Sequence, residues 1–370
     1  MKVAIIHYWF ITRRGGEKVV ESILKKYPQA DIYTLFYDRE KYGNHLDNHN
    51  VYSSILNTKF LRKFYQKIFP LYPLGIKSLK LKKEYDLIIS SESGPAKGIK
   101  IPNKACHICY IHSPMRYAWS HTELYLQSSS YLLRPILRSL FEKLQKWDKS
   151  TIDNVDLYIA NSFNVAERVK KYYNRESIVI HPPIEEKLFE KELRNSTNEV
   201  YLSFGAITPY KKIDLLIDVF NLNGKELVII GEGSEKEKLR KKAKDNIRFE
   251  SFPNWEDVQN VIYKTKALLF PGEEDFGMIP LEIMAYGIPV IAYKKGGALE
   301  TIIENKLKIE ESSGIFFEKQ SVESFNDALE YYEKNHLLFN REFIRNQARK
   351  FKESNFLHKF ENEVKSHIEK

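Results

Sequence analysis

Short apolar runs alternate with stretches of helical periodicity along this chain. The helical stretches include Glu17–Tyr27, Val165–Tyr172, Lys212–Phe220 and Ser234–Lys244. Apolar runs of four to eight residues are typical of strands buried on both faces of a parallel sheet. The alternation therefore predicts an α/β fold built from parallel sheets. The expected strands are Val3–Tyr8, Ile32–Tyr37, Leu87–Ser90, His107–His112, Leu157–Asn161, Tyr201–Ile207, Leu227–Gly231, Ala267–Pro271 and Pro289–Tyr293.

The length of 370 residues suits two domains, and the alternation weakens in the stretch PPIEEKLFEKELRNSTN. A diproline start and a polar end are typical of a linker. We therefore expect an N-terminal Rossmann-like domain over residues 1–182, a linker over 183–198 and a C-terminal Rossmann-like domain over 199–345. Residues 346–370 are expected to form a C-terminal helix that packs back on the first domain. Functional residues should follow the strands, because ligands of open parallel sheets bind outside the carboxyl ends.

The net charge of +9 predicts anionic partners, which leaves nucleic acid, a membrane surface and phosphorylated substrates open. No Asp or Glu occurs between Asp47 and Glu84, and the interval mixes Lys and Arg with aromatic residues. It is interpreted as a solvated helical face or as a contact with anionic lipid headgroups. No recognised nucleic-acid motif accompanies it, so no nucleic-acid partner is expected. The candidate membrane or acceptor surface is Lys59, Arg62, Lys63 and Lys67, with a second amphipathic candidate at Tyr131–Lys149.

Several other features limit the location and the chemistry. No stretch approaches 18 uninterrupted apolar residues, so no membrane span is expected. The N-terminal apolar run is followed by Arg13 and Arg14 and is interpreted as a buried strand rather than a signal peptide. The two cysteines, Cys106 and Cys109, are expected to be buried structural thiols, because nothing completes a zinc site. The expected location is the cytoplasm, either free or peripheral on the inner face of the plasma membrane.

The richest candidate chemistry lies in FPGEEDFGMIPLEIMAYGIPVIAYKKGGALET, residues 270–301. Glu274 and Glu282 are eight positions apart, and Pro280 is typical of the first turn of a helix. Ionised carboxylates only accept hydrogen bonds, so two of them can hold hydroxyls of one ligand. The free N–H groups at the helix start favour an anion such as a diphosphate. The alternative is a solvated acidic loop before an ordinary helix.

The pattern Glu274-Asp275-Phe276-Gly277 followed by Glu282 resembles the E-x-F-G-x-x-x-x-E signature of retaining family 4 glycosyltransferases. Other stretches resemble elements of the same family in the same order, and YIHSPMRYAWS is similar to an element of its bacterial GDP-mannose-dependent mannosyltransferase subgroup. The resemblance implies the GT-B fold, in which two Rossmann-like domains face each other across a cleft. The other matching stretches are HYWFITRRGGEKVVESIL, DLYIANS, VIHPP, GAITPYKKIDLLIDVF and GGALET.

The resemblance implies a role for each matching residue. Glu282 would accept hydrogen bonds from the nucleotide ribose, Glu274 would hold hydroxyls of the donor sugar, and Lys211 would pair with the diphosphate. His112 would border the donor sugar and the acceptor hydroxyl. The catalytic set is therefore His112, Glu274 and Lys211. The donor-binding set is Gly15, Gly16, Gly205, Lys211, Gly231, Glu274, Phe276, Gly277, Met278 and Glu282.

One position departs from the family pattern. Ala206 stands where the family usually has an arginine, within the string Gly205-Ala206-Ile207-Thr208-Pro209-Tyr210-Lys211. Arginine makes bidentate contacts to phosphate that alanine cannot make. Either another cation substitutes, or donor binding is weaker, or activity is lost. The candidate substitute cations are Arg116, Lys212 and Arg14.

The resemblance implies a retaining transfer of a hexosyl unit to a growing bacterial glycan or a lipid-linked acceptor. The implied donor is GDP-mannose, with UDP-sugars as the alternative. No cofactor beyond this nucleotide-sugar co-substrate and no bound metal is expected, because no Asp-x-Asp motif occurs. Two other functions stay open, a nucleotide-sugar epimerase of the same fold and a non-catalytic nucleotide-sugar-binding subunit.

Overall fold

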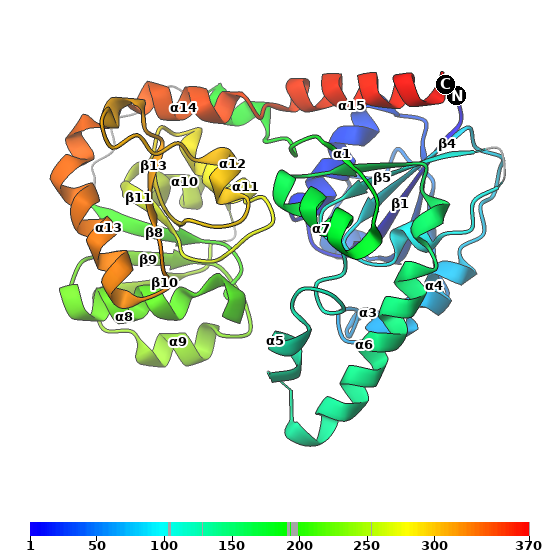
Figure 1. The fold of residues 1–370 in the computed structure, drawn as a ribbon, viewed down its shortest axis with the longest axis horizontal. Helices are drawn as coiled ribbons and strands as arrows, with labels where there is room; N and C mark the ends of the chain where they lie inside the picture. Colours follow the sequence, from blue (N-terminus) through cyan, green and yellow to red (C-terminus); the bar gives the residue numbers. More distant parts are fainter. Residues whose placement is uncertain (103–104, 128, 191–192, 194–198, 253, 370) are drawn as a thin grey trace. The chain divides into compact units, whose positions relative to one another are not determined.

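A computed structural model of the chain describes residues 1–102, 105–127, 129–190, 193, 199–252 and 254–369 (Figure 1). The chain divides into two compact units. Unit 1 comprises Met1–His181 and Phe356–Lys370, and unit 2 comprises Pro182–Asn355. Each unit contains one parallel sheet with helices packed against it, as the alternation of apolar and amphipathic stretches predicts.

Unit 1 is built on a seven-stranded parallel sheet in the order β3-β2-β1-β4-β5-β6-β7. Its strands are β1 (Val3–Phe10), β2 (Asp31–Tyr37), β3 (Val51–Ser53), β4 (Leu87–Glu92), β5 (Cys106–Ile111), β6 (Leu157–Ala160) and β7 (Ile178–Val179). Its helices are α1 (Gly15–Lys26), α2 (Arg39–Tyr42), α3 (Lys59–Arg62), α4 (Tyr72–Ser78), α5 (Thr122–Gln127), α6 (Arg134–Lys149) and α7 (Phe163–Tyr173).

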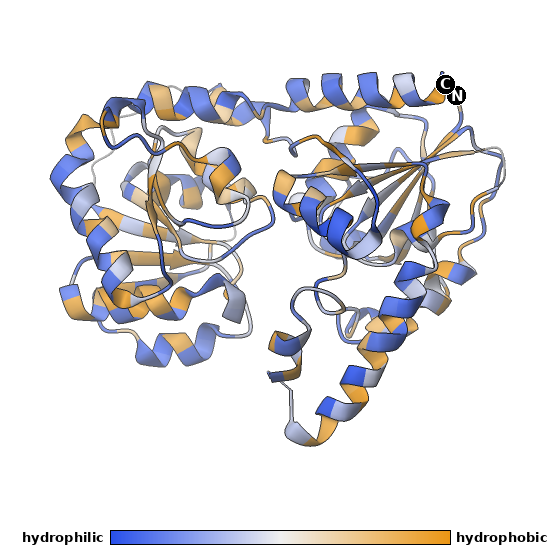
Figure 2. Ribbon diagram, in the orientation of Figure 1, coloured by the Kyte–Doolittle hydropathy of each residue, from blue (hydrophilic) through white to orange (hydrophobic). Residues whose placement is uncertain are grey.

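The core of unit 1 lies on both faces of its sheet. Because successive side chains of a strand point to opposite faces, Ile5 and Ile6 of β1 enter two separate apolar clusters. Figure 2 shows the strands as the most hydrophobic part of the unit. The last helix, α15 (Glu353–Ile368), contributes Phe356, Phe360 and Val364 to the cluster that contains Ile5. This apolar stripe is what attaches the C-terminal segment to unit 1.

Unit 2 is built on a six-stranded parallel sheet in the order β10-β9-β8-β11-β12-β13. Its strands are β8 (Val200–Phe204), β9 (Leu227–Ile230), β10 (Ile247–Glu250), β11 (Thr265–Phe270), β12 (Val290–Tyr293) and β13 (Gly314–Phe317). Its helices are α8 (Ile213–Asn223), α9 (Lys236–Lys242), α10 (Trp255–Tyr263), α11 (Met278–Met284), α12 (Ala298–Thr301), α13 (Val322–Asn335) and α14 (Arg341–Arg349).

All nine strands expected from the sequence are present, but four further strands were missed. The missed strands, β3, β7, β10 and β13, are the two edges of each sheet. An edge strand pairs on one side only and can be short, so it carries a weaker apolar signal. The parallel α/β architecture is therefore confirmed, and the sequence pattern identified the interior of each sheet.

The first unit ends within one residue of the predicted end of the first domain, but the expected linker and C-terminal segment are divided differently. Ile184 and Leu188 lie in the expected linker, yet both are buried in the core of unit 2. Residues 191–192 and 194–198 of that linker lie outside the described residues. The expected C-terminal helix is two helices, and the chain joins unit 1 only from Phe356 onward. Within the described residues, no helix combines the length and the apolar character needed to cross a membrane.

Candidate functional site

Two loops of unit 2 press against each other where β8 and β9 end. Gly205 donates a backbone hydrogen bond of 2.9 Å to Ile230 O, and a Cβ on Gly231 would lie 1.8 Å from Gly205 O. A Cβ on Gly233 would lie 2.1 Å from Ile207 O. Backbone approach therefore leaves no room for a side chain at Gly231 and Gly233, whereas Gly205 has a φ of +130° that favours glycine. Gly233 was missed by the sequence analysis, although it completes the string Gly231-Glu232-Gly233.

A pocket opens beside these loops, at the carboxyl ends of β8 and β11. Ligands of open parallel α/β sheets bind at the carboxyl ends of the strands. Ala206, which stands where the family pattern usually has an arginine, is among the residues that line this pocket. The other lining residues are Ser203, Phe204, Gly205, Ile207, Lys211, Ile213, Ile229, Leu269, Phe270, Pro271 and Gly272.

Lys211 and Glu274 form an ion pair at this pocket. Their side chains are 15% and 12% exposed, so the pair is largely removed from water. Lys211 Nζ also lies 5.5 Å from the centre of the Phe270 ring. The two residues that the sequence assigned to the diphosphate and to the donor sugar are thus in direct contact. Together they offer a cation and an acceptor within one partly desolvated site.

The loop after β12 lies beside the loop that carries Glu274. Glu274 pairs with Gly296 as an isolated parallel bridge, and Gly297 N donates to Glu274 O at 2.9 Å. A Cβ on Gly297 would lie 2.2 Å from Phe276 Cα, so this position also excludes a side chain. The stretch GGALET is therefore adjacent to Glu274, as expected for two loops of one site.

The helix α11 begins at the pocket loop. Gly277 precedes it with φ +87°, a conformation that favours glycine, and Pro280 lies in its first turn as predicted. Glu282 follows on the same helix and is 7% exposed. The Phe276 side chain is buried in the core of unit 2 and contacts Phe351 at a ring separation of 5.7 Å. A contact between Phe276 and a donor would therefore involve its backbone rather than its ring.

Unit 1 has its own cluster of candidate residues at the carboxyl end of its sheet. The helix α1 begins at Gly15, and a Cβ on Gly16 would lie 3.6 Å from the His7 ring and 3.7 Å from His112 Nε2. His112 directly follows β5, and its Nε2 lies 2.8 Å from Ser91 Oγ. Gly16 and His112, which are far apart in sequence, are thus brought together in unit 1.

His7 and Glu17 complete that cluster and were missed by the sequence analysis. His7 Nε2 lies 3.6 Å from Glu17 Oε1, and both side chains are essentially fully buried. Glu17 also accepts a hydrogen bond of 2.9 Å from the backbone N–H of Arg14. His7 lies within the apolar run of β1, and the sequence does not show which face of the sheet a histidine in a strand occupies.

The candidate substitute cations lie in different places. Lys212 precedes α8 in unit 2 with the left-handed φ of +54°, next to the ion-paired Lys211. Arg14 precedes α1, and Arg116 lies in the loop after β5, so both belong to unit 1. Lys212 is therefore the candidate that shares a unit with the pocket.

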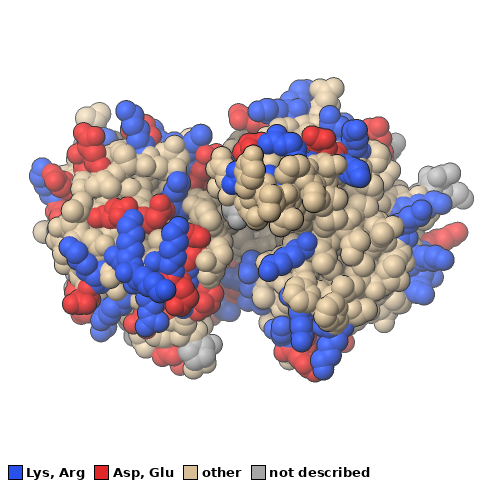
Figure 3. All heavy atoms as spheres, turned by 90° about the horizontal axis from the view of Figure 1, so that it is seen from below, with Lys and Arg blue, Asp and Glu red and all other residues tan. Residues whose placement is uncertain are grey.

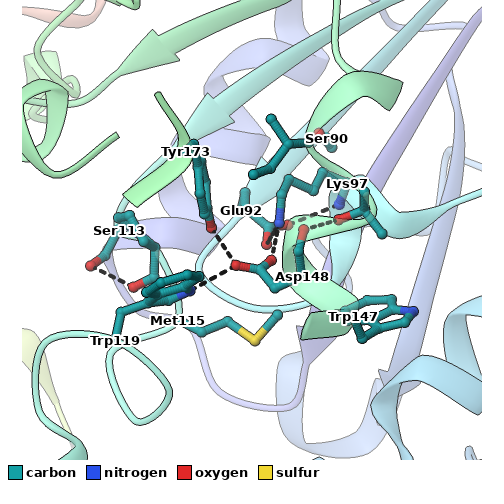
Figure 4. A network of polar contacts seen from close by, with 12 residues as sticks. Ser90, Glu92, Lys97, Ser113, Met115, Trp119, Trp147, Asp148 and Tyr173 are labelled. Carbon is teal, nitrogen blue, oxygen red and sulfur yellow. Dashed lines mark hydrogen bonds and ion pairs between the residues drawn. The ribbon is translucent and has the colours of Figure 1, made fainter. Parts of the chain in front are cut away.

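A buried ionic network supports the loop that follows His112 (Figure 4). Lys97 and Asp148 are fully buried and form an ion pair, and Lys97 Nζ lies 3.8 Å from Glu92 Oε1. Asp148 Oδ2 accepts hydrogen bonds of 2.8 Å from Trp119 Nε1 and from the Tyr173 hydroxyl. The network therefore joins β4, α6 and α7 to the loop of Trp119. No motif in the sequence pointed to it.

The charges in this network are set by burial. Burial raises the pKa of Glu92 to about 8, while Lys97 opposes the shift. Burial lowers the pKa of Lys97, but Asp148 and Glu92 outweigh that effect and the net shift is upward. Burial thus favours the protonated form of Glu92, which lies beside the Lys97–Asp148 ion pair. Since His112 N donates to Glu92 O at 2.8 Å, the network borders the residues around His112 directly.

Both cysteines, Cys106 and Cys109, lie on β5. Cys109 is buried and Cys106 is half-buried, and both are free thiols. Burial raises the pKa of Cys106 to about 11 and raises that of Cys109 further, so both are protonated at neutral pH. Across the described residues, no group of three or more His, Cys, Asp or Glu residues could hold a metal ion.

Residues 184–351 match the family model of group 1 glycosyl transferases. Among curated proteins, the chain is similar to the alpha-1,3/1,6-mannosyltransferase ALG2 of Saccharomyces cerevisiae. The two are 26% identical over 353 residues, which cover 78% of this chain and 68% of that one. It is also similar to the O-antigen chain mannosyltransferase C of Escherichia coli, at 21% identity over 368 residues, which cover 94% and 91%. These findings support a glycosyltransferase.

Solved structures show the same fold. Anabaena HepE in complex with UDP is similar with a TM-score of 0.73 at 16% identity, covering 99% of this chain and 100% of that one. A sucrose-phosphate synthase from Thermosynechococcus elongatus is similar with a TM-score of 0.73 at 15% identity, and each chain is covered completely. The α/β GT-B fold, with two Rossmann-like parallel sheets, is thereby confirmed.

Proposed function

We propose that the protein is a retaining hexosyltransferase that uses a nucleoside diphosphate sugar, with GDP-mannose as the donor and a bacterial glycan or lipid-linked glycan as the acceptor. The observation that carries this proposal is the Lys211–Glu274 ion pair at the pocket of unit 2. A diphosphate needs a cation and a sugar needs hydroxyl acceptors. The mannosyl preference is supported by relatives named as mannosyltransferases.

In the proposed reaction, the acceptor hydroxyl oxygen bonds to the anomeric carbon on the face from which the diphosphate leaves. The bond from that carbon to the phosphate oxygen breaks, and the departing phosphate takes the acceptor proton. Lys211 stabilises the negative charge that develops on the leaving group, so no bound metal is required. Glu274 holds sugar hydroxyls, and His112 contacts the sugar without acting as a strong base.

Donor binding can be tested by calorimetric titration of GDP-mannose, UDP-glucose and UDP-N-acetylglucosamine, followed by product analysis with and without glycan acceptors. We expect GDP-mannose to bind most tightly and the product to keep the anomeric configuration. Turnover should persist in EDTA. Conversion of the donor to an epimer without any acceptor would instead favour an epimerase, and tighter binding of a UDP-sugar would contradict the assignment of the base.

The ribose assignment is tested by Glu282→Ala, with Glu330→Ala on the outer helix α13 as the matched control. Loss of a charge-assisted hydrogen-bond pair should weaken GDP-mannose binding by about 1.5–3 kcal/mol. Because Glu282 is buried, the thermal unfolding of the variant is measured alongside. Unchanged donor affinity in a folded Glu282→Ala protein would show that Glu282 does not hold the ribose.

A second candidate, a non-catalytic nucleotide-sugar-binding subunit, is favoured by Ala206, which leaves the pocket without the usual arginine. Both proposals predict that the nucleotide-sugar binds, and they differ in whether the sugar is then transferred. Donor binding with neither transfer nor hydrolysis across a panel of acceptors would support the binding subunit. Any acceptor-dependent release of GDP would exclude it.

A further inference from the structure

One arm of unit 1 exposes apolar residues at its tip. The fully buried residues of α6 are Phe141, Leu144 and Asp148, all in its C-terminal half. Its first turns contact the α5 segment through Arg134, which donates to Gln127 O at 3.3 Å, and through the Arg138–Glu123 ion pair. The short turn η3 (Tyr131–Leu133) precedes α6, and Figure 1 shows that α5, η3 and α6 form an arm that extends away from the sheet of unit 1. We call residues 131–136 the arm tip.

The arm tip is the most apolar exposed segment of this arm. Tyr131 is 78% exposed, Leu132 82%, Leu133 51% and Ile136 59%. Single exposed leucines are ordinary, but contiguous exposed apolar residues indicate a binding surface. Leu132 and Ile136 are four positions apart, which places them on neighbouring turns and forms one apolar end. A convex apolar tip does not enclose a small ligand, so its partner must be large.

Cations lie at this apolar tip and along the helix that follows it. The Arg134 guanidinium lies 5.7 Å from the centre of the Tyr131 ring, and Lys143 and Lys146 follow along α6. Arg138 is ion-paired with Glu123 of α5 at 3.0 Å. The two acidic residues of α6 are Glu142 and Asp148, and Asp148 is buried in its ion pair with Lys97. A tyrosine beside arginine at the border of an apolar cluster is the composition found at membrane–water interfaces, where one end is apolar and the other is wet.

The basic stretch after Asp47 meets this arm. Phe69 of η1 (Phe69–Leu71) stacks on Phe141 of α6 with a ring separation of 5.4 Å. Lys59, Lys63 and Lys67 are exposed in the same stretch. Phe60 and Leu74 accompany them at 68% and 58% exposure. The Phe69–Phe141 contact joins the two amphipathic segments, and we call their exposed residues together the joined surface.

Arg62 differs from its neighbours in this stretch. Its guanidinium donates to Tyr37 O at 2.9 Å and lies 3.7 Å from Asp38 Oδ2. This cation therefore anchors α3 to the sheet and is not free to contact an outside partner. Figure 3, which views the molecule from below, shows a broad uncharged area on unit 1 with Lys and Arg, and some Asp and Glu, at its border.

We propose that this joined surface docks unit 1 on an anionic lipid bilayer, with the arm tip inserted among the acyl chains and the exposed cations on the headgroups. Charge complementarity favours a lipid surface over a second copy of the chain, because two such basic surfaces would repel each other. This inference is independent of the donor and goes beyond the proposed function, since it states where the protein is held.

The test is co-sedimentation of the full chain with vesicles of phosphatidylcholine containing phosphatidylglycerol, compared with pure phosphatidylcholine. The wild type should bind the anionic vesicles, and added salt should weaken the binding. Leu132→Ser combined with Leu133→Ser should lower the partition coefficient by roughly tenfold or more, because two leucine side chains no longer leave water. The matched control is Leu307→Ser combined with Leu337→Ser, two exposed leucines of unit 2 that are 96% and 84% exposed.

The charge contribution is tested separately with Lys59→Ser, Lys63→Ser and Lys67→Ser in one protein, which should bind anionic vesicles more weakly. All these side chains are exposed, so thermal unfolding should not change. Absence of wild-type binding, or equal binding by the tip variant and its control, would overturn the proposal. A dimer in sedimentation velocity that the tip variant dissociates would also overturn it and assign the tip to a second copy. Donor binding in solution is measured in parallel, so failure of the membrane proposal is separable from failure of the proposed function.

Discussion

The Lys211–Glu274 ion pair makes the assignment of the diphosphate cation testable with Lys211→Met. The variant keeps the length of the aliphatic stem and removes the ammonium group. Loss of a charge-assisted contact to phosphate costs about 1.5–3 kcal/mol. At 1.4 kcal/mol per factor of ten, this corresponds to roughly 10- to 150-fold weaker binding. Because Lys211 already pairs with Glu274, the diphosphate must compete with a carboxylate, and we expect the lower end of that range.

The assay is calorimetric titration of GDP and of GDP-mannose at fixed ionic strength. The matched control is Lys225→Met, since Lys225 also belongs to unit 2 and also forms an ion pair, with Glu333 at 2.8 Å. Lys225 precedes β9, so it lies at the amino ends of the strands, whereas the pocket lies at their carboxyl ends. This control should bind GDP with the affinity of the wild type.

A companion variant, Glu274→Ala, separates the two halves of the donor. Removing the competing carboxylate should leave GDP affinity unchanged or higher, while the extra affinity that the sugar contributes should disappear. The reasoning is refuted if Lys211→Met binds GDP as tightly as the Lys225→Met control does. It is also refuted if Glu274→Ala weakens GDP and GDP-mannose by the same factor, because Glu274 would then act on the nucleotide.

Three further outcomes are expected. Ala206→Arg should tighten GDP binding in calorimetry, because the new guanidinium enters the pocket that Ala206 lines; unchanged or weaker binding would show that another cation already serves the phosphates. Gly231→Ala should destabilise unit 2 by about 1–3 kcal/mol in urea unfolding, because its Cβ would lie 1.8 Å from a backbone oxygen. The control Gly224→Ala, at φ +70° with open space around it, should lower the free energy of unfolding by less. The pKa of Glu92 is raised from 4.5 to about 8, so between these pH values the native state holds a proton that the unfolded chain releases. The free energy of unfolding should therefore fall as pH rises through this window. Glu92→Gln should flatten that decline in unfolding measured against pH, and an unchanged slope would mean that another group titrates.

Much of the fold could be predicted because the sheet interiors obey local rules. A strand buried on both faces is mostly apolar, so β1 and β11 are visible in the sequence as apolar runs even though they contain His7 and Lys266. The strands that escaped prediction are the sheet edges, where β3 and β7 have three and two residues and no fully buried position. Their pairing depends on the neighbouring strand rather than on their own composition.

The candidate site was predicted in part for the same reason. The stretch from Phe270 to Glu282 carries its strand, its glycine and its helix start in consecutive residues, and the structure places them so. Phe276 shows the limit of this reasoning, because its ring belongs to the core of unit 2. A motif identifies which residues occur together, whereas burial decides which of their atoms face a ligand.

The sequence by itself determined the alternation of strands and helices, the two sheets and the positions of the loops at their carboxyl ends, because these depend on local periodicity and on glycine. Only the tertiary structure decided which charges meet. Lys211 reaches Glu274, and Lys97 reaches Asp148, across long separations in sequence. Buried charges must find partners in space, since desolvation is costly for an unpaired ion, and no local pattern encodes the partner. Likewise, the exposure of Leu132 follows from where α6 leaves the core, which the helical periodicity alone does not specify.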